Sequence, residues 1–260
     1  MIRMGIGGWV YAPWRGTFYP KGLPQVRELA HASRNVTTIE INGTFYGTQK
    51  PESFRRWAAE VPDDFVFSLK APRYATHRRV LAEAGPSIER FIVSGLGELQ
   101  GKLGPILWQF PPSKQFEPDD FAAFLGLLPR ALDGRPLRHA VEVRHESFRQ
   151  AAFVELMRNS GAAIALVDSE KHPLIADVTA DFVYARLQRT EEEIITGYGE
   201  GALDTWAARA RTFEAVGTPG DLPALVAPPP EKQRDVFVYM IAGAKLRAPA
   251  AAMALIERVR

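Results

Sequence analysis

Polar and charged side chains recur at the ends of short apolar segments throughout this sequence. The side chains in these positions are Glu40, Asn42, Lys70, Arg73, Gln109, Glu142, Arg144, Asp168 and Arg186. A carboxylate near a lysine or arginine can move a proton while the cation binds an anionic group of a ligand. Polar groups at one end of successive strands meet in a single site, as they do in β/α barrels. The pattern indicates where a site lies, but it does not name a reaction.

Strand-like segments alternate with helical patterns along the chain. The strand-like segments are residues 4–7, 37–41, 65–69, 106–110, 140–143, 163–167, 182–187 and 236–241. Strands that alternate with helices pair in parallel, and eight of them is the number in a closed β/α barrel. We therefore expect the α/β class and a single (β/α)8 TIM-like barrel domain over residues 1–260. The stretch 168–181 contains Pro173 and no clear helical pattern, so we expect an irregular sixth crossover.

The connections between these segments carry helix signals. Pro51, Pro86 and Pro118 stand where proline is favoured, at a first helical position. Ser147 and Gln150 have the spacing of a capping box. We expect helices over residues 52–60, 86–103, 118–132, from 147 onward, 204–216 and 248–259.

Alternation along each strand predicts which side chains face the barrel axis. In residues 39–42 the isoleucines are expected to face the helices, so Glu40 and Asn42 face inward. The same alternation predicts an inward orientation for Ser68, Lys70, Gln109, Glu142, Arg144, Tyr184, Arg186 and Tyr239. The predicted ring at the mouth sets three acids, Glu40, Glu142 and Asp168, against three bases, Lys70, Arg144 and Arg186.

Two interpretations of this ring stay open at this point. Charges beside a dry core must be paired or hydrated, so the ring can be a closed salt-bridge network that plugs the barrel. Alternatively it is open to a polar or anionic ligand. The predicted roles are then proton transfer for Glu40 and Glu142, and substrate binding for Asn42, Lys70, Arg73, Gln109, Arg144, Asp168 and Arg186.

The composition narrows the class of protein. Lysine and arginine total 32 against 30 acidic residues, which argues against a general polyanion-binding surface. The absence of cysteine excludes disulfides, thiolate metal sites and cysteine nucleophiles. No apolar run approaches the ~20 residues of a membrane span and no signal peptide is evident, so a cytoplasmic protein without membrane contact is expected. Neither a nucleophile elbow nor a complete dinucleotide fingerprint is present.

Other groups offer competing interpretations. Glu40, Glu142, His145, Asp168 and His172 include metal-ligand types, but without a recognised spacing, so we predict no metal and leave any cofactor unassigned. The aromatic residues Trp9, Trp14, Phe18, Tyr19, Phe45 and Tyr46 are suited to stack a sugar or base, or to form an apolar lid.

These residues are compatible with three functions. The preferred one is an enzyme that acts on a small anionic or sugar-like substrate by acid/base chemistry. A second is a nucleic-acid-binding or repair-associated protein, because Arg73, His77, Arg78 and Arg79 form a basic loop near the aromatic residues. The small net charge of +2 counts against it. The third is a barrel scaffold without catalysis. The oligomeric state is left open.

Several segments together resemble the YecE-like family, the domain of unknown function DUF72. They are residues 5–9 (GIGGW), 40–46 (EINGTFY), 51–57 (PESFRRW), 67–73 (FSLKAPR), 103–112 (LGPILWQFPP) and 140–145 (AVEVRH). The resemblance covers nearly the whole chain and implies a TIM-like β/α barrel. It supplies no activity, because none is established for the family.

Two segments depart from the family pattern. The seventh strand of the family usually ends in Arg-Leu-His-Gly, where this chain has Gln188 and Arg189 at the last two positions. A Phe-Asn-Asn type segment usually follows the eighth strand, where this chain has Ile241 and Ala242. If that histidine and those asparagines act in the family, this chain is expected to have changed its substrate or lost activity.

Overall fold

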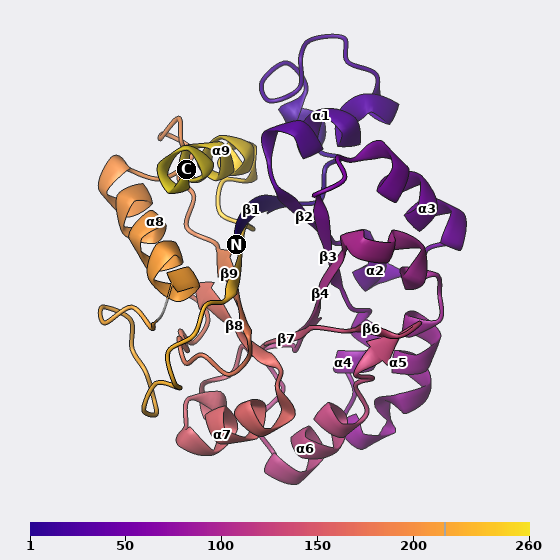
Figure 1. Ribbon diagram of the computed structural model, residues 1–260, viewed down its shortest axis with the longest axis vertical. Helices are drawn as coiled ribbons and strands as arrows, with labels where there is room; N and C mark the ends of the chain where they lie inside the picture. Colours follow the sequence, from indigo (N-terminus) through magenta and orange to yellow (C-terminus); the bar gives the residue numbers. More distant parts are fainter. Residues whose placement is uncertain (216) are drawn as a thin grey trace.

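Parallel strands enclose the centre of the molecule. The computed structural model describes residues 1–215 and 217–260, and within them eight strands close into a barrel in the order β1-β10-β9-β8-β7-β4-β3-β2. Figure 1 shows these strands as an inner ring with the helices outside. Their bounds are β1 Ile2–Gly7, β2 Thr38–Ile41, β3 Val66–Lys70, β4 Leu103–Gln109, β7 His139–Glu142, β8 Ala163–Asp168, β9 Phe182–Leu187 and β10 Asp235–Met240. The predicted TIM-like barrel is confirmed.

Helices cover the outside of the barrel. They are α1 Glu28–Asn35, α2 Gly43–Tyr46, α3 Pro51–Glu60, α4 Arg73–Thr76, α5 Gly85–Ile92, α6 Pro118–Gly126, α7 Ala151–Ser160, α8 Glu200–Ala215 and α9 Ala248–Val259. The last helix packs against α8 and β1, so the end of the chain lies beside its beginning (Figure 1). The predicted helix 204–216 begins earlier, at Glu200; its last position, 216, lies outside the described residues. No helix among the described residues is long and apolar enough to cross a membrane.

Three helix predictions need correction. The helix expected over 86–103 stops at Ile92, because Gly95 takes a positive φ of 118° and a separate 3₁₀ turn, Leu96–Lys102, follows. The helix expected over 118–132 ends at Gly126, and a two-stranded ribbon of β5 (Ala131–Leu132) and β6 (Arg135–Pro136) comes after it. The capping box is wrong: Ser147 lies in a 3₁₀ turn and its hydroxyl accepts from the Phe116 N–H.

The sixth crossover is irregular, as predicted. The chain between β8 and β9 forms no helix. Side chains hold it in place: the Asp177 carboxylate accepts from the backbone N–H groups of Leu225 and Val226, and the Thr179 hydroxyl bonds to the backbone beside β8. These bonds tie the crossover to β8 and to the segment after α8, and they satisfy backbone polar groups of those two segments.

The barrel interior has an apolar lower layer and a polar upper layer. The lower layer is made by Leu107, Ala140, Ala163, Ala165, Phe182 and Phe237, together with the rings of Tyr184 and Tyr239. Alanines on β7 and β8 leave room for the aromatic rings on β9 and β10. The Tyr239 hydroxyl bonds to Thr38 and Ser68 across the barrel, which begins the polar layer above.

Two glycines of β1 set how closely the strands approach. A Cβ at Gly5 would lie 1.9 Å from the Thr38 carbonyl oxygen, so no side chain fits between β1 and β2. A Cβ at Gly7 would lie 2.6 Å from Ile241 Cδ1 and 3.0 Å from Asn42 Nδ2. The Gly5-x-Gly7 spacing is thus explained by packing and by the space kept at the carboxyl end of the barrel, with no phosphate site required.

Candidate functional site

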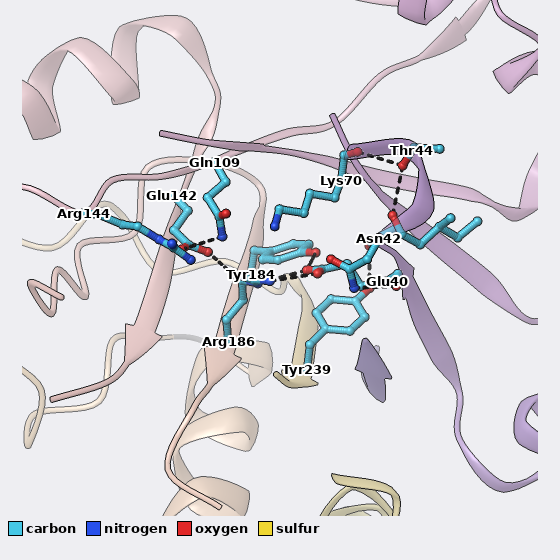
Figure 2. A network of polar contacts seen from close by, with 12 residues as sticks. Glu40, Asn42, Thr44, Lys70, Gln109, Glu142, Arg144, Tyr184, Arg186 and Tyr239 are labelled. Carbon is cyan, nitrogen blue, oxygen red and sulfur yellow. Dashed lines mark hydrogen bonds and ion pairs between the residues drawn. The ribbon is translucent and has the colours of Figure 1, made fainter. Parts of the chain in front are cut away.

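A buried arginine joins two strands across the mouth of the barrel. Arg186 on β9 donates from Nη2 and Nε to the two carboxylate oxygens of Glu40 on β2, at 2.9 and 3.0 Å. Its Nη1 donates to Glu142 on β7, from the other side (Figure 2). The side chain of Arg186 is 1% exposed and both carboxylates are 0% exposed. The predicted inward orientation of these three residues is confirmed by their contacts.

The remaining carboxylate oxygens are also occupied. The Tyr184 hydroxyl donates to Glu40 Oε2 at 2.7 Å. Gln109 Nε2 and Arg144 Nε both donate to Glu142 Oε1, at 2.9 and 2.7 Å. Every oxygen of Glu40 and Glu142 therefore accepts at least one hydrogen bond. This layer is the closed salt-bridge network that the sequence left as one alternative.

The charges of this network keep Glu142 and Arg186 ionised. Burial alone would raise the pKa of Glu142, but the positive charges of Arg186 and Arg144 outweigh it and lower that pKa to about 2. Burial would lower the pKa of Arg186, but Glu142 and Glu40 raise it above its ordinary value. Burial and the Glu40 charge raise the pKa of Tyr184, which keeps the phenol protonated. The network is a stable ionic floor at neutral pH.

A cavity of about 550 Å³ opens above this floor. Its polar wall consists of Asn42, Gln49, Lys70, Gln109, Arg144, Arg186, Gln188 and Lys245, and its apolar wall includes Trp9, Trp14, Tyr46, Trp57, Met240 and Ile241. Four cations line it and, among the described residues, no aspartate or glutamate does. The closed network and the open pocket therefore exist together, one below the other.

Lys70 is the buried cation of the wall. It ends β3, and its Nζ lies 3.8 Å from the centre of the Phe45 ring. Figure 2 shows the backbone carbonyl of Lys70 accepting from Thr44, whereas the amine has no hydrogen bond or ion pair with any described residue. Burial and the charge of Arg186 lower the pKa of Lys70 to about 8, against the opposing effect of the two carboxylates.

Arg144 supplies a second cation near the opening. Only its Nε contacts Glu142, and its side chain is 23% exposed. The two terminal nitrogens form no hydrogen bond with the described residues. A guanidinium edge with two unused nitrogens is suited to grip a carboxylate or phosphate.

Two predicted binding residues lie elsewhere. Asp168 does not join the ring: the inward positions of β8 are occupied by Ala163 and Ala165, and alternation turns Asp168 toward the helices. It lies 3.8 Å from Arg189 and lines a separate cavity with Trp206. Arg73 begins α4, is exposed and does not line the central cavity. The predicted ring of three acids and three bases therefore loses one acid.

Some of the residues that line the cavity were not predicted from the sequence. Lys245 lies in the loop after β10, where it approaches the Tyr11 ring to 4.6 Å, and no local pattern marks it. Gln49 and Trp57 also line the wall, and the sequence analysis predicted neither of them there. Among the aromatic residues that were suggested to stack a ligand, those that line the cavity are Trp9, Trp14 and Tyr46.

The candidate metal ligands do not form a cluster. Within the described residues, no three histidine, aspartate or glutamate side chains gather to hold a metal ion. His145 Nδ1 lies 2.9 Å from the Ser147 hydroxyl. His172 lies in the sixth crossover, where burial and the charge of Arg144 lower its pKa. The absence of a metal from the function stays a prediction.

The fold and the cavity define a β/α barrel protein with a charged site at the carboxyl ends of its strands. The family model "Protein of unknown function DUF72" matches residues 3–260, and the chain belongs to this family. The UPF0759 protein YecE of Escherichia coli is 29% identical over 164 residues, which cover 62% of this chain and 55% of YecE. The chain thus matches about half the length of that relative.

Solved structures agree with this assignment. A DUF72 family protein of Enterococcus faecalis superposes with a TM-score of 0.72 at 16% identity, covering 100% of this chain and 95% of the other. One from Thermotoga maritima gives 0.71 at 22% identity, covering 98% and 97%. At these identities the likeness shows the shared fold. Gln188, Ile241 and Ala242, the positions at which the sequence is expected to depart from the family pattern, all line the cavity.

Proposed function

We propose that the central cavity binds a small anionic molecule of about sugar size and that the protein acts on it as an enzyme. The observation that carries this proposal is the wall with four cations and no carboxylate among the described residues. The two carboxylates below it are paired with Arg186 and with the Nε of Arg144, so the Lys70 ammonium and the two terminal nitrogens of Arg144 stay available to a ligand. The size of the cavity is in the range typical of small-molecule sites.

The geometry supports different roles from those expected for the acids. Glu40 and Glu142 are fully buried and hydrogen-bonded at every oxygen, so we assign them to holding Arg186 and Arg144 in position. Lys70 is the group in the wall that gains or loses a proton near neutral pH. A general acid or base works best when its pKa lies near the working pH, and Lys70 meets that condition.

The uncharged wall fits a polyhydroxy or carboxylate-bearing skeleton. Asn42, Gln49, Gln109 and Gln188 offer amide donors and acceptors, and Trp9 with Trp57 offers aromatic surface. A sugar ring presents apolar faces to aromatic rings and hydroxyls to amides. Sugar phosphates, sugar acids and small oxo acids are therefore the first ligands to try.

A thermal-shift panel tests the proposal. It contains inorganic phosphate, sugar phosphates, small carboxylates, the matching neutral sugars and short single-stranded oligonucleotides. A ligand at 100 times its dissociation constant adds about 2.7 kcal/mol to the free energy of unfolding, or roughly 5–10 °C for a chain of this size. We expect anionic small molecules to raise the melting temperature and the neutral sugars to leave it unchanged.

Two variants locate the binding. Arg144→Ala is expected to reduce the shift to half or less, while Arg73→Ala, which removes an exposed arginine outside the cavity, leaves it intact. Shifts that keep their full size in Arg144→Ala and vanish in Arg73→Ala would contradict the proposal. If oligonucleotides alone bind, with an affinity that falls steeply with salt, the nucleic-acid alternative replaces it.

A further inference from the structure

Lys70 is the one lysine among the described residues whose side chain is buried, with 8% of its surface exposed. Lys245 lines the same cavity near the Tyr11 and Trp14 rings, but it is only partly buried. Lys102 and Lys114, by comparison, bind backbone carbonyl or carboxylate oxygens at the edge of the molecule. The Lys70 amine instead ends in the cavity with no oxygen partner among the described residues. A buried amine without a hydrogen-bond acceptor is less stabilised in its protonated form.

We propose that Lys70 forms a covalent imine with the carbonyl group of the ligand, which is a small aldehyde or ketone that carries a carboxylate or phosphate. This inference rests on the proposed function, because the same cavity must first bind the anion. It deepens that function by naming the reactive group of the protein and the substrate class.

The electrostatic setting favours a nucleophilic amine. Lysines become nucleophiles when they are desolvated or placed next to another cation, and Lys70 meets both conditions. Burial and Arg186 bring its pKa to about 8. Compared with an ordinary lysine, the neutral fraction at pH 7 is on the order of a hundredfold larger. The face of the Phe45 ring attracts the ammonium weakly, but it accepts no proton and leaves the nitrogen lone pair available.

The step balances with groups that are at hand. The neutral amine attacks the carbonyl carbon, a C–N bond forms, and a proton moves from nitrogen to the former carbonyl oxygen to give a carbinolamine. A proton from solvent then protonates the hydroxyl, which leaves as water while the nitrogen lone pair forms the C=N bond, and the N–H proton of the resulting iminium returns to solvent to give the imine. One water is released for each carbonyl consumed, and no oxidant or reductant is required.

The cavity supplies a place for the rest of such a substrate. Arg144 presents two unused guanidinium nitrogens to a carboxylate or phosphate. Gln109 and Asn42 line the same wall and can hold the carbinolamine hydroxyl through their amides. The substrate class is therefore a small molecule with an anionic group at one end and a carbonyl group at the other.

Borohydride trapping tests the inference on the intact protein. The probes are pyruvate, glyoxylate and dihydroxyacetone phosphate, with acetone as the uncharged control. Sodium cyanoborohydride reduces an imine to a stable secondary amine, which intact-mass spectrometry counts and peptide mapping locates. We expect one adduct per chain, on Lys70, for at least one charged probe, and a trapping rate that rises as the pH passes through about 8.

Variants separate Lys70 from other amines. Lys70→Arg keeps the positive charge and is expected to remove the adduct, while Lys171→Arg, at an exposed lysine, leaves it unchanged. Adducts scattered over surface lysines, or an adduct that persists in Lys70→Arg, would overturn the inference. Anion binding by thermal shift with no Lys70 adduct for any probe would overturn the imine and leave the proposed function standing. Failure of both measurements would remove the proposed function as well.

Discussion

Arg144 donates its Nε to Glu142 at 2.7 Å and keeps both terminal nitrogens free of partners among the described residues. The carboxylate thus fixes the direction of the guanidinium without neutralising its outer edge. Glu142 meanwhile receives Arg186 on its other oxygen, so it is shared between a wholly buried arginine and a partly exposed one. A buried ion network in this way orients a cation toward the cavity.

Loss of Arg144 should weaken anion binding more than it weakens the fold. A hydrogen bond to a charged group contributes about 1.5–3 kcal/mol, so Arg144→Ala should lower the affinity for the best anionic ligand by roughly 10- to 100-fold. Isothermal titration calorimetry measures the affinity and urea unfolding measures the stability. A loss of stability with an unchanged affinity would show that Arg144 serves only the network.

Removal of a carboxylate from the network should destabilise the protein. Glu40→Gln leaves Arg186 with only one buried counter-charge, and breaking a buried ion pair costs about 3–5 kcal/mol. Urea unfolding of Glu40→Gln against Glu52→Gln, which alters an exposed acid on α3, measures the difference. A cost below about 1 kcal/mol, the range of an exposed pair, would contradict the described network.

The lowered pKa of Glu142 predicts an acid dependence of stability. Its pKa is about 2 in the folded protein, below its ordinary value, so the unfolded chain binds the proton more readily. The stabilisation is complete above the ordinary carboxyl range and is lost as the pH falls toward 2. The stability difference between the wild type and Glu142→Gln should therefore shrink from pH 6 to pH 2. A difference that stays constant over this interval would show that Glu142 has an ordinary pKa.

Lys70 should give a second pH dependence of stability, at alkaline pH. Its pKa of about 8 is lower than that of a free lysine, so the unfolded chain binds more protons between these values and stability rises with pH there. Below pH 8 the buried charge costs stability. Lys70→Met should thus be more stable than the wild type at pH 7, with the advantage shrinking toward pH 10. If Lys70→Met is less stable at pH 7, the ammonium is stabilised by contacts other than those described.

The backbone at Ala242 gives a prediction about the cavity rim. Ala242 has a φ of +66°, a left-handed conformation that costs a non-glycine residue about 1–2 kcal/mol. Ala242→Gly should raise the free energy of unfolding by about 1 kcal/mol, whereas Ala244→Gly, where φ is −75°, should lower it. Melting curves of both variants check the sign. Equal effects at the two positions would contradict the left-handed conformation of Ala242.

The barrel and most of the ionic floor were predictable because they follow from local rules. Strand alternation alone placed Glu40, Glu142 and Arg186 on the inside. The prediction that Asp168 faces inward was wrong, because this residue lies one position past the last inward position of β8. A one-residue shift turns a side chain to the opposite face of a strand, so strand ends are where such reasoning is weakest.

The upper wall of the cavity could not be predicted in the same way. Lys245, Gln49 and Trp57 reach it from loops and a helix that are distant in sequence, and only the closed barrel brings them together. Which carboxylates remain open to a ligand was also beyond the sequence, because it depends on hydrogen bonds between strands. Pairing across the barrel, rather than residue type, decides that Glu40 and Glu142 are closed off while Lys70 is not.

The central claim is that a small anion binds between Lys70 and Arg144. The most direct test is a crystal structure of the protein with the ligand that gives the largest thermal shift. The account predicts electron density in the cavity, with an anionic group within hydrogen-bond distance of an Arg144 terminal nitrogen and ligand atoms adjacent to Lys70 Nζ. Density bound at the exposed basic residues Arg73 and Arg79 instead, with the cavity holding only water, would contradict it.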